Sequence, residues 1–124
     1  MVKWTEGRLK SFITSVIRGG FRKYPEKYEC LNAAKAGKQV NVKTGRLAEH
    51  YKCNHCGVAY PAKDVQVDHI DPVVDLSQGF VNWDVYIKRM YVDSSGLQVL
   101  CSACHTVKTA AERQSRSKKN YVNK

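Results

Sequence analysis

The chain has 124 residues, enough for one domain with an appendage, and a formal net charge of +10. The charge falls into three blocks: residues 1–52 carry twelve Lys and Arg against four Asp and Glu, residues 53–104 carry three against six, and residues 105–124 carry six against one. The apolar runs are too short to cross a bilayer and no signal-peptide pattern accompanies the five cysteines, so a reducing, cytoplasmic location is expected.

The first fifty residues are predicted to form two basic helices and a hairpin. Apolar residues recur at helical spacing between Thr5 and Arg18, and they are Leu9, Phe12, Ile13, Val16 and Ile17. Gly19 and Gly20 supply a stop for this helix, whose outer face is basic.

A second helix opens with Pro25, a residue favoured at the first helical position. Cys30 lies within this helix with no second cysteine nearby, so we expect a small core residue rather than a metal ligand. Residues 39–42 and 47–51 then flank a short connection with Gly45 at the position that needs a positive φ, which predicts a β-hairpin.

Residues 51–113 are predicted to form a separate module with two strands and two helices. Val65–Ile70 is rich in β-branched residues and predicts the first strand. Asn82 is expected to cap a helix from residue 83 to about residue 91, with four inward-facing residues: Trp83, Tyr86, Ile87 and Met90. Leu97–Leu100 predicts the second strand.

The last helix is predicted to begin at Ser102 or Cys104 and to end near Arg113. Its spacing places four residues on one face: His105, Lys108, Thr109 and Glu112. Residues 114–124 are polar and basic, which is typical of a disordered tail that can order on a polyanion.

Four cysteines form two C-x-x-C pairs, Cys53 with Cys56 and Cys101 with Cys104. Four thiolates at this spacing can close a tetrahedral site for structural Zn²⁺. His105 follows Cys104 directly and could replace it as a ligand, but with four cysteines present we expect the all-cysteine site.

Between the two pairs, the first strand ends in Asp68 and His69. Asp68 offers a hard oxygen ligand and His105, at the start of the last helix, offers an imidazole, so together they could hold one divalent metal with open positions for water and a phosphate oxygen. His69 can be neutral near pH 7 and take a proton from an attacking water. These residues suit hydrolysis of a phosphodiester.

These motifs resemble the HNH endonucleases of the ββα-metal fold in their zinc-stabilised form, over about residues 51–112. The matching stretches are Cys53-x-x-Cys56, Val67-Asp68-His69-Ile70-Asp71-Pro72, and Leu97-Gln98-Val99-Leu100-Cys101-x-x-Cys104-His105-x-x-Lys108-Thr109. The whole chain is also similar to free-standing HNH proteins of tailed bacteriophages, through Gly45-Arg46-Leu47-Ala48 and a Trp-Asp-x-Tyr-Ile-x-Arg helix.

The resemblance implies an α+β fold with a ββα-metal module, a His69 base, and Asp68 with His105 binding Mg²⁺ or Mn²⁺. It also implies that Lys108 contacts a phosphate near the cut, and that cleavage leaves a 5′ phosphate and a 3′ hydroxyl. One position departs from the family pattern: Gly96 stands where Asn is common and holds the loop between the strands. Asn82 could supply that amide, but its place before Trp83 favours helix capping.

The expected function is therefore a metal-dependent DNA endonuclease, and the alternative is a zinc-stabilised nucleic-acid-binding module without catalysis. Four basic residues near the C-terminus are predicted to join Lys108 in nucleic-acid binding: Arg113, Arg116, Lys118 and Lys119. Duplex DNA is the expected partner, with a phage packaging or replication protein as a second one. The chain is expected in the host cytoplasm as a monomer or weak dimer, with no membrane association.

Overall fold

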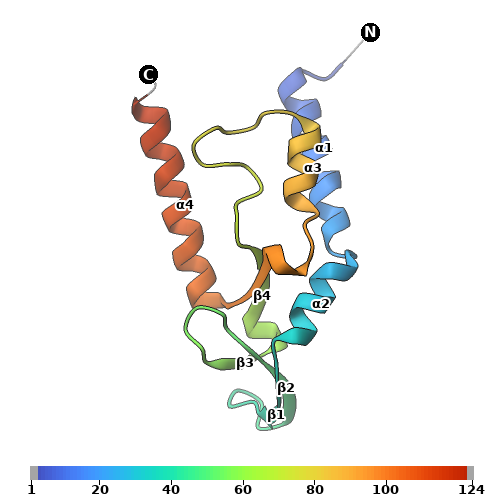
Figure 1. Cartoon of the computed structure of the whole chain (residues 1–124), viewed down its shortest axis with the longest axis vertical. Coiled ribbons are helices and arrows are strands. Elements are labelled where there is room, and N and C mark those ends of the chain that lie inside the picture. The colour runs from blue at the N-terminus through green and yellow to red at the C-terminus, as the bar shows by residue number, and fades with distance from the viewer. Residues whose placement is uncertain (1–2, 123–124) are drawn as a thin grey trace.

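The structure, a computed structural model, describes residues 3–122, with side chains described as far as residue 115. It is an α+β fold with four α-helices and two small sheets (Figure 1). In chain order the elements are α1 (Glu6–Phe21), α2 (Pro25–Ala33), β1 (Lys35–Val40), β2 (Leu47–Lys52), β3 (Ala59–Pro61), β4 (Val65–His69), α3 (Trp83–Met90), β5 (Leu97–Cys101) and α4 (Ser102–Val122).

The first sheet is antiparallel in the order β1-β2-β3 and contains the predicted hairpin. Gly45 has a φ of 73° in the connection between β1 and β2, which is the backbone conformation that the turn was expected to need. β1 begins earlier than predicted, at Lys35, and its pairing with β2 is irregular at Gly37, where φ is 93°. A glycine tolerates this positive φ, so the strand continues through the irregularity.

The second sheet consists of β4 and β5, paired antiparallel with Val65 opposite Cys101 and His69 opposite Leu97. Both strands agree with the prediction to within one residue at each end. The pairing extends one step further, because the Ile70 N–H donates to the Gly96 carbonyl at 3.0 Å. Since β5 runs directly into α4, this sheet fixes the start of the last helix relative to the end of β4.

The apolar core is divided into two clusters. The larger one lies where α2 meets the second sheet and contains four buried residues: Cys30, Val65, Leu97 and Val99. Cys30 is therefore a core residue, as predicted. The smaller cluster consists of Cys53, Leu100 and Cys101. Two of its three buried side chains are cysteines, so this cluster offers little apolar burial of its own.

The first helix extends past the predicted glycine stop and ends at Phe21. Thr5 caps it, with its hydroxyl accepting from the Arg8 N–H at 3.2 Å. Glycine costs only about 1 kcal/mol in a helix interior, and here it has a packing role. A Cβ on Gly20 would lie 2.5 Å from Tyr91 Oη, so the absent side chain allows α1 to approach the residue after α3.

The amphipathic pattern of α1 is only partly used, because none of its residues is fully buried and Leu9, Phe12 and Val16 are exposed. α3 follows the prediction more closely: Asn82 caps it, accepting from the Val85 N–H at 2.9 Å, and Tyr86 and Met90 are buried. Ile87 was expected to face inward, but it is 43% exposed. The core is too small to cover every apolar residue of these helices.

The last helix continues to Val122, beyond the end predicted near Arg113, and covers most of the segment predicted to be a disordered tail. The reason is local: no Gly or Pro follows residue 96, and Lys, Arg and Gln are good helix formers. None of the helices in residues 3–122 is both long and apolar enough to span a membrane.

Candidate metal centre and adjoining cleft

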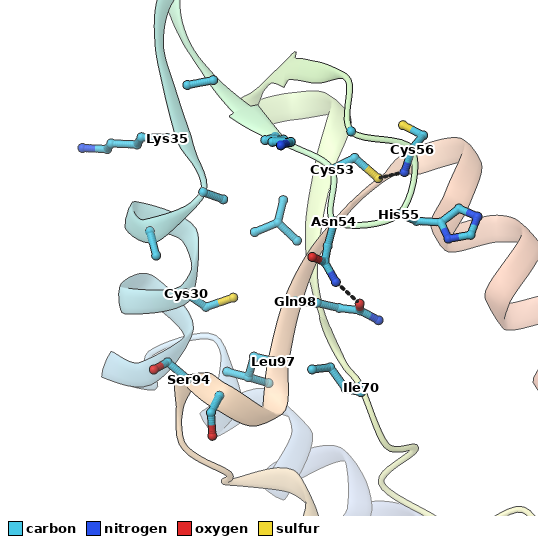
Figure 2. Close-up of a pocket in the computed structure, with 17 residues that line it drawn as sticks. Cys30, Lys35, Cys53, Asn54, His55, Cys56, Ile70, Ser94, Leu97 and Gln98 are labelled. Carbon is cyan, nitrogen blue, oxygen red and sulfur yellow. Dashed lines mark hydrogen bonds between the residues drawn. The ribbon is translucent and has the colours of Figure 1, made fainter.

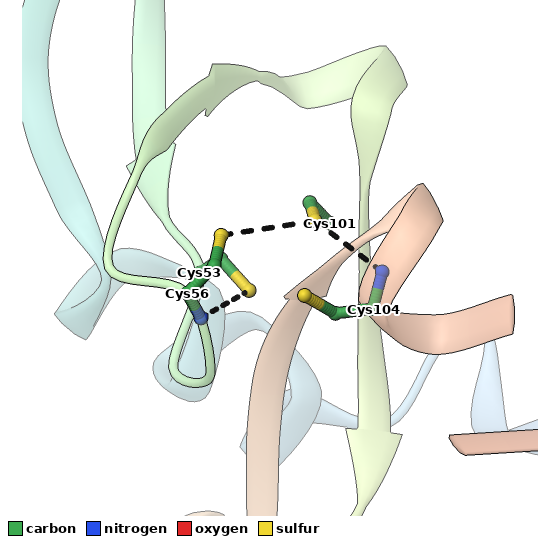
Figure 3. A group of neighbouring side chains, drawn as sticks. All are labelled: Cys53, Cys56, Cys101 and Cys104. Atoms are coloured by element: carbon green, nitrogen blue, oxygen red, sulfur yellow. Dashed lines mark hydrogen bonds between the residues drawn. The ribbon is translucent and has the colours of Figure 1, made fainter. Parts of the chain in front are cut away.

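The two C-x-x-C pairs come together as predicted (Figure 3). The Sγ atoms of Cys53, Cys56, Cys101 and Cys104 all lie within 4.8 Å of one another, and Cys56 Sγ is 4.0 Å from Cys101 Sγ. Zn–S bonds of about 2.3 Å in a tetrahedron place sulfurs about 3.8 Å apart, so small adjustments suffice to bind zinc. His105 does not belong to this group.

Backbone N–H groups support the quartet from within each pair. The Cys56 N–H donates to Cys53 Sγ and the Cys104 N–H donates to Cys101 Sγ, both at 3.5 Å. Burial raises the pKa of Cys53, but backbone N–H donors, led by that of Cys56, outweigh it and lower the pKa to about 6. A thiolate is therefore available at neutral pH, which is the form that a metal binds.

β4 presents Asp68 and His69 to different neighbours, because successive side chains of a strand point to opposite faces. Asp68 faces α4, where it meets His105 and Lys108. His69 faces the other way, toward Phe21 of α1 and Met90 of α3. The adjacent Asp-His pair thus joins two separate groups of residues at one strand end.

On the α4 side, Asp68 Oδ1 lies 3.8 Å from His105 Nε2. The other oxygen, Asp68 Oδ2, is buried and lies 2.9 Å from the ammonium of Lys108. The space for a cation is therefore at Oδ1, whose separation from His105 Nε2 leaves room for one ion between the two side chains. Asp68 and His105 therefore fit a divalent ion with two protein ligands.

Lys108 is held inside this group by three oxygens. Its ammonium contacts Asp68 Oδ2 at 2.9 Å, Glu112 Oε1 at 2.5 Å and the His69 carbonyl at 3.1 Å. Burial lowers the pKa of Lys108, but the hydrogen bonds to Glu112 and Asp68 outweigh it and the pKa is raised. Because an ammonium has three donors, a contact between Lys108 and a phosphate requires one of these bonds to open.

His69 is oriented on two sides. Its Nε2 lies 2.7 Å from the Met90 carbonyl oxygen, and its ring lies against that of Phe21, with 4.7 Å between the centroids. A carbonyl can only accept a hydrogen bond, so Nε2 must carry the proton. In the neutral ring this leaves Nδ1 as the nitrogen that can accept a proton.

A cavity of about 340 Å³ connects the two groups. Asp68, His69, Lys108 and Glu112 line it, together with Arg18 and Phe21 from α1. Arg18 and Phe21 were not predicted as site residues, and no motif in the sequence indicates them, because their position depends on how α1 packs against α3. In Figure 1, α4 stands on one side of this region and α1 with α3 on the other.

The largest cavity, about 810 Å³, lies elsewhere, between α2, β5 and the first cysteine pair (Figure 2). Neither Asp68 nor His69 lines it, and it contains no carboxylate. Polar side chains that line it include Lys35, Lys52 and Asn54, and the Asn54 amide donates to Gln98 Oε1 at 2.9 Å, which ties the first cysteine pair to β5. We therefore assign the chemistry to the smaller cavity, where the titratable groups converge.

Of the other residues predicted to bind nucleic acid, the structure describes the side chain of one. Arg113 is exposed on α4, five residues after Lys108. Arg116, Lys118 and Lys119 lie outside the residues whose side chains are described. His55, in the first cysteine pair, is exposed, as expected of a residue that does not bind the metal. The chain matches no family model, no curated protein and no solved structure.

Proposed function

We propose that the chain is a metal-dependent DNA endonuclease of the HNH type, in which β4, β5 and the start of α4 form a ββα-metal module held by structural Zn²⁺. The observation that carries this proposal is the junction of a Nε2-protonated histidine, His69, with a carboxylate-imidazole pair, Asp68 and His105, at one strand end. A module that only binds nucleic acid needs neither group.

His69 is suited to be the general base. Its hydrogen bond to the Met90 carbonyl fixes the tautomer, and its contact with Phe21 fixes the plane of the ring. A base that is held in one tautomer and orientation can accept a proton from water at Nδ1 without first reorganising. Loss of either contact would leave the ring free to turn.

Asp68 and His105 would hold Mg²⁺ or Mn²⁺, which when bound stabilises negative charge on the phosphate and on the departing oxygen. Lys108 forms an ion pair with Asp68 that is largely shielded from solvent, so the ammonium and the metal would share this carboxylate. Arg18 lines the same cavity from α1 and carries a charge complementary to a phosphate.

The proposed substrate is duplex DNA, because its phosphates complement the basic N-terminal and C-terminal blocks that flank the acidic middle of the chain. The resemblance to phage proteins further suggests action in the host cytoplasm, next to a packaging or replication protein, as a monomer or weak dimer. The proposed products carry a 5′ phosphate and a 3′ hydroxyl.

A supercoiled-plasmid assay with Mg²⁺ or Mn²⁺ tests the proposal. We expect the wild-type protein to nick or linearise the plasmid, and His69→Ala and a chelator to abolish this. His55→Ala is the matched control, because it removes an exposed histidine of the same module and should cleave like the wild type. Analysis of the product ends checks the 5′ phosphate.

A different result would favour the second candidate. If wild type and His69→Ala bind the plasmid equally and neither cuts it with any divalent ion, the chain is a zinc-stabilised binding module. A 3′ phosphate on the products would contradict the hydrolytic route even if cleavage occurs.

A further inference from the structure

The segment that follows β4 is held by one side chain of α3. The Arg89 guanidinium donates from Nη2 to the Pro72 carbonyl at 2.5 Å, and from Nε to the Pro72 and Val73 carbonyls, both at 3.0 Å. Pro72 and Val73 both line the cavity that contains Asp68 and His69. A planar guanidinium that spans two consecutive carbonyls fixes the backbone in position and direction.

The next residue on the same helix holds the proposed base. Met90 is buried, and its carbonyl accepts the hydrogen bond from His69 Nε2. Residues 69–73 are therefore attached to the last turn of α3 at both ends, by His69 to Met90 and by residues 72–73 to Arg89. Loss of the Arg89 attachment would release the far end of the segment and leave the His69 ring held only by the contacts of residues 69 and 70.

At the start of the segment the Lys108 ammonium also donates to the His69 carbonyl, at 3.1 Å, but among the described residues only Arg89 donates a side-chain hydrogen bond to the carbonyls of Pro72 and Val73. Gly96, opposite this segment at the start of β5, contributes only its carbonyl, which accepts from the Ile70 N–H at 3.0 Å. Val92 leaves no space for a side chain there, since a Cβ on Gly96 would lie 2.9 Å from Val92 Cγ2. Asn82 uses its own side chain to cap α3.

We propose that Arg89 is a positioning residue: by clamping the Pro72 and Val73 carbonyls to α3, it keeps residues 69–73 in place and holds His69 against the Met90 carbonyl in the Nε2-protonated tautomer. The inference rests on the proposed function for its catalytic consequence, but the placement of the ring can be measured without any activity. Arg89 itself does not touch the reacting atoms.

The test compares four full-length proteins loaded with zinc: wild type, Arg89→Ala, Arg89→Lys and Lys88→Ala. Lys88 is the matched control, because it is an exposed basic residue on the same helix that lacks the carbonyl contacts of Arg89. Single-turnover cleavage of plasmid with Mn²⁺ gives the rate, and plasmid binding in Ca²⁺ gives the affinity.

We expect Arg89→Ala to cleave about 10²-fold more slowly, because small misplacements of a reacting group have effects of this size. Its plasmid affinity should stay the same. Arg89→Lys should recover part of the rate, since an ammonium can reach a carbonyl but cannot bridge two as the fork does. Guanidinium added far below denaturing concentration should raise the cleavage rate of Arg89→Ala and leave that of the wild type unchanged. If Arg89→Ala were slow only because it is less stable, added guanidinium would not raise its rate.

A long-range ¹H–¹⁵N spectrum of the histidine rings supplies the second readout. We expect His69 to be a single Nε2–H tautomer in the wild type and in Lys88→Ala, and to exchange between tautomers in Arg89→Ala. If Arg89→Ala cleaves like Lys88→Ala, the inference is overturned. It is equally overturned if Arg89→Ala does not fold and Arg89→Lys keeps both the full rate and the wild-type spectrum.

Failure of the proposed function gives a separate pattern. If the wild type does not cut, the endonuclease proposal fails, and the positioning role of Arg89 is then tested by the histidine spectra alone. An unchanged His69 tautomer in Arg89→Ala overturns this role. A mixture of tautomers supports the role of Arg89 in placing the ring, without any catalytic consequence.

Discussion

The carboxylate of Asp68 has two neighbours that act on it in different ways. Lys108, at 2.9 Å, forms an ion pair with one carboxylate oxygen, whereas His105, at 3.8 Å from the other, is separated from it by enough space for a cation. In the proposed site, a metal would bind at the oxygen that faces His105. This arrangement makes Asp68 the most informative single position to change.

Asp68→Asn keeps the shape of the side chain and removes its charge. We expect metal-dependent cleavage to fall by about 10²-fold or more, because an amide is a far weaker ligand for Mg²⁺ or Mn²⁺. Titration of the cleavage rate with Mn²⁺ measures this. Asp84→Asn, an exposed position in the first turn of α3, makes the same chemical change away from the cavity and should leave the titration unaltered. Equal curves for both variants would refute the ligand assignment.

Gly96 leads to a second prediction, about packing. Asn is common at this position in the HNH proteins that the sequence motifs resemble, but a Cβ here would lie 2.9 Å from Val92 Cγ2 and 3.0 Å from Val92 Cβ. We expect Gly96→Asn to lower the free energy of unfolding by about 1–3 kcal/mol through overpacking.

A double variant shows whether crowding against Val92 is the cause of this loss of stability. Val92→Ala with Gly96→Asn should lose less stability than the sum of the two single changes, because the alanine removes the atoms that clash. Urea melts of the four proteins in this cycle give the coupling energy. Strict additivity would mean that Val92 is not the obstacle.

At the level of secondary structure, the contact between α1 and Tyr91 determines where the first helix can lie. Tyr91 Oη donates to the Ile17 carbonyl and occupies the place that a side chain on Gly20 would need. Arg18 is fixed in the same region, with its Nε donating to Tyr86 Oη at 3.1 Å. Through these contacts, α1 brings Arg18 and Phe21 into the proposed site.

Two neighbouring glycines of α1 test this contact. Alanine is preferred to glycine in a helix by about 1 kcal/mol, and Gly19→Ala should gain stability, since the nearest atom to its Cβ is Arg22 Nη2 at 3.5 Å. Gly20→Ala should instead lose about 1–3 kcal/mol, because Tyr91 must move and give up its bond to Ile17. Thermal melts compare them, and a stabilised Gly20→Ala would show that the contact does not constrain α1.

The elements that the sequence predicted well have local causes. Asn82 caps α3, Gly45 forms the hairpin turn, and the β-branched run marks β4 in the sequence, although its strand partner β5 lies farther along the chain. The convergence of the four cysteines was also predictable, because two C-x-x-C pairs can close one tetrahedron. Metal binding by two C-x-x-C pairs depends little on the path that the chain takes between them.

What could not be predicted depends on packing between distant segments. α1 continues past Gly20, where Tyr91 from far along the chain occupies the space of a side chain, and Ile87 is exposed because the small core leaves it uncovered. The orientation of His69 likewise depends on a backbone carbonyl and on the ring of Phe21, neither of which has a sequence signature. The roles of Asp68, His69 and His105 stay predictions until activity is measured.

For the molecule as a whole, we expect zinc bound by the four cysteines to supply stability that the small apolar core lacks. Zinc binding to such a site contributes on the order of 10 kcal/mol or more, which equals or exceeds the total stability of a typical small domain. The buried cluster around Cys53, Leu100 and Cys101 is too small to replace it. Folding and metal binding should therefore be a single event.

Cys53→Ser and Cys101→Ser should both unfold the module. Each removes a thiolate ligand, whereas His69→Ala leaves the metal site intact and should stay folded. Circular dichroism melts, together with zinc content per chain, measure the effect. Cys30→Ala is the control: it removes a buried thiol outside the quartet and should retain one zinc with a modest loss of stability. An unchanged melting curve for Cys53→Ser would refute the proposed role of the metal.

The position of the quartet along the chain also has a consequence for biosynthesis. Residues 57–100 separate its two halves, and β4 has to wait for β5, which contains Cys101. A ribosome therefore releases the first cysteine pair and the unpaired edge of β4 well before the second pair can join them. Until then the emerging strand is open to pairing with other chains. Zinc supply at the moment when the second pair emerges should therefore decide how much of the protein escapes aggregation.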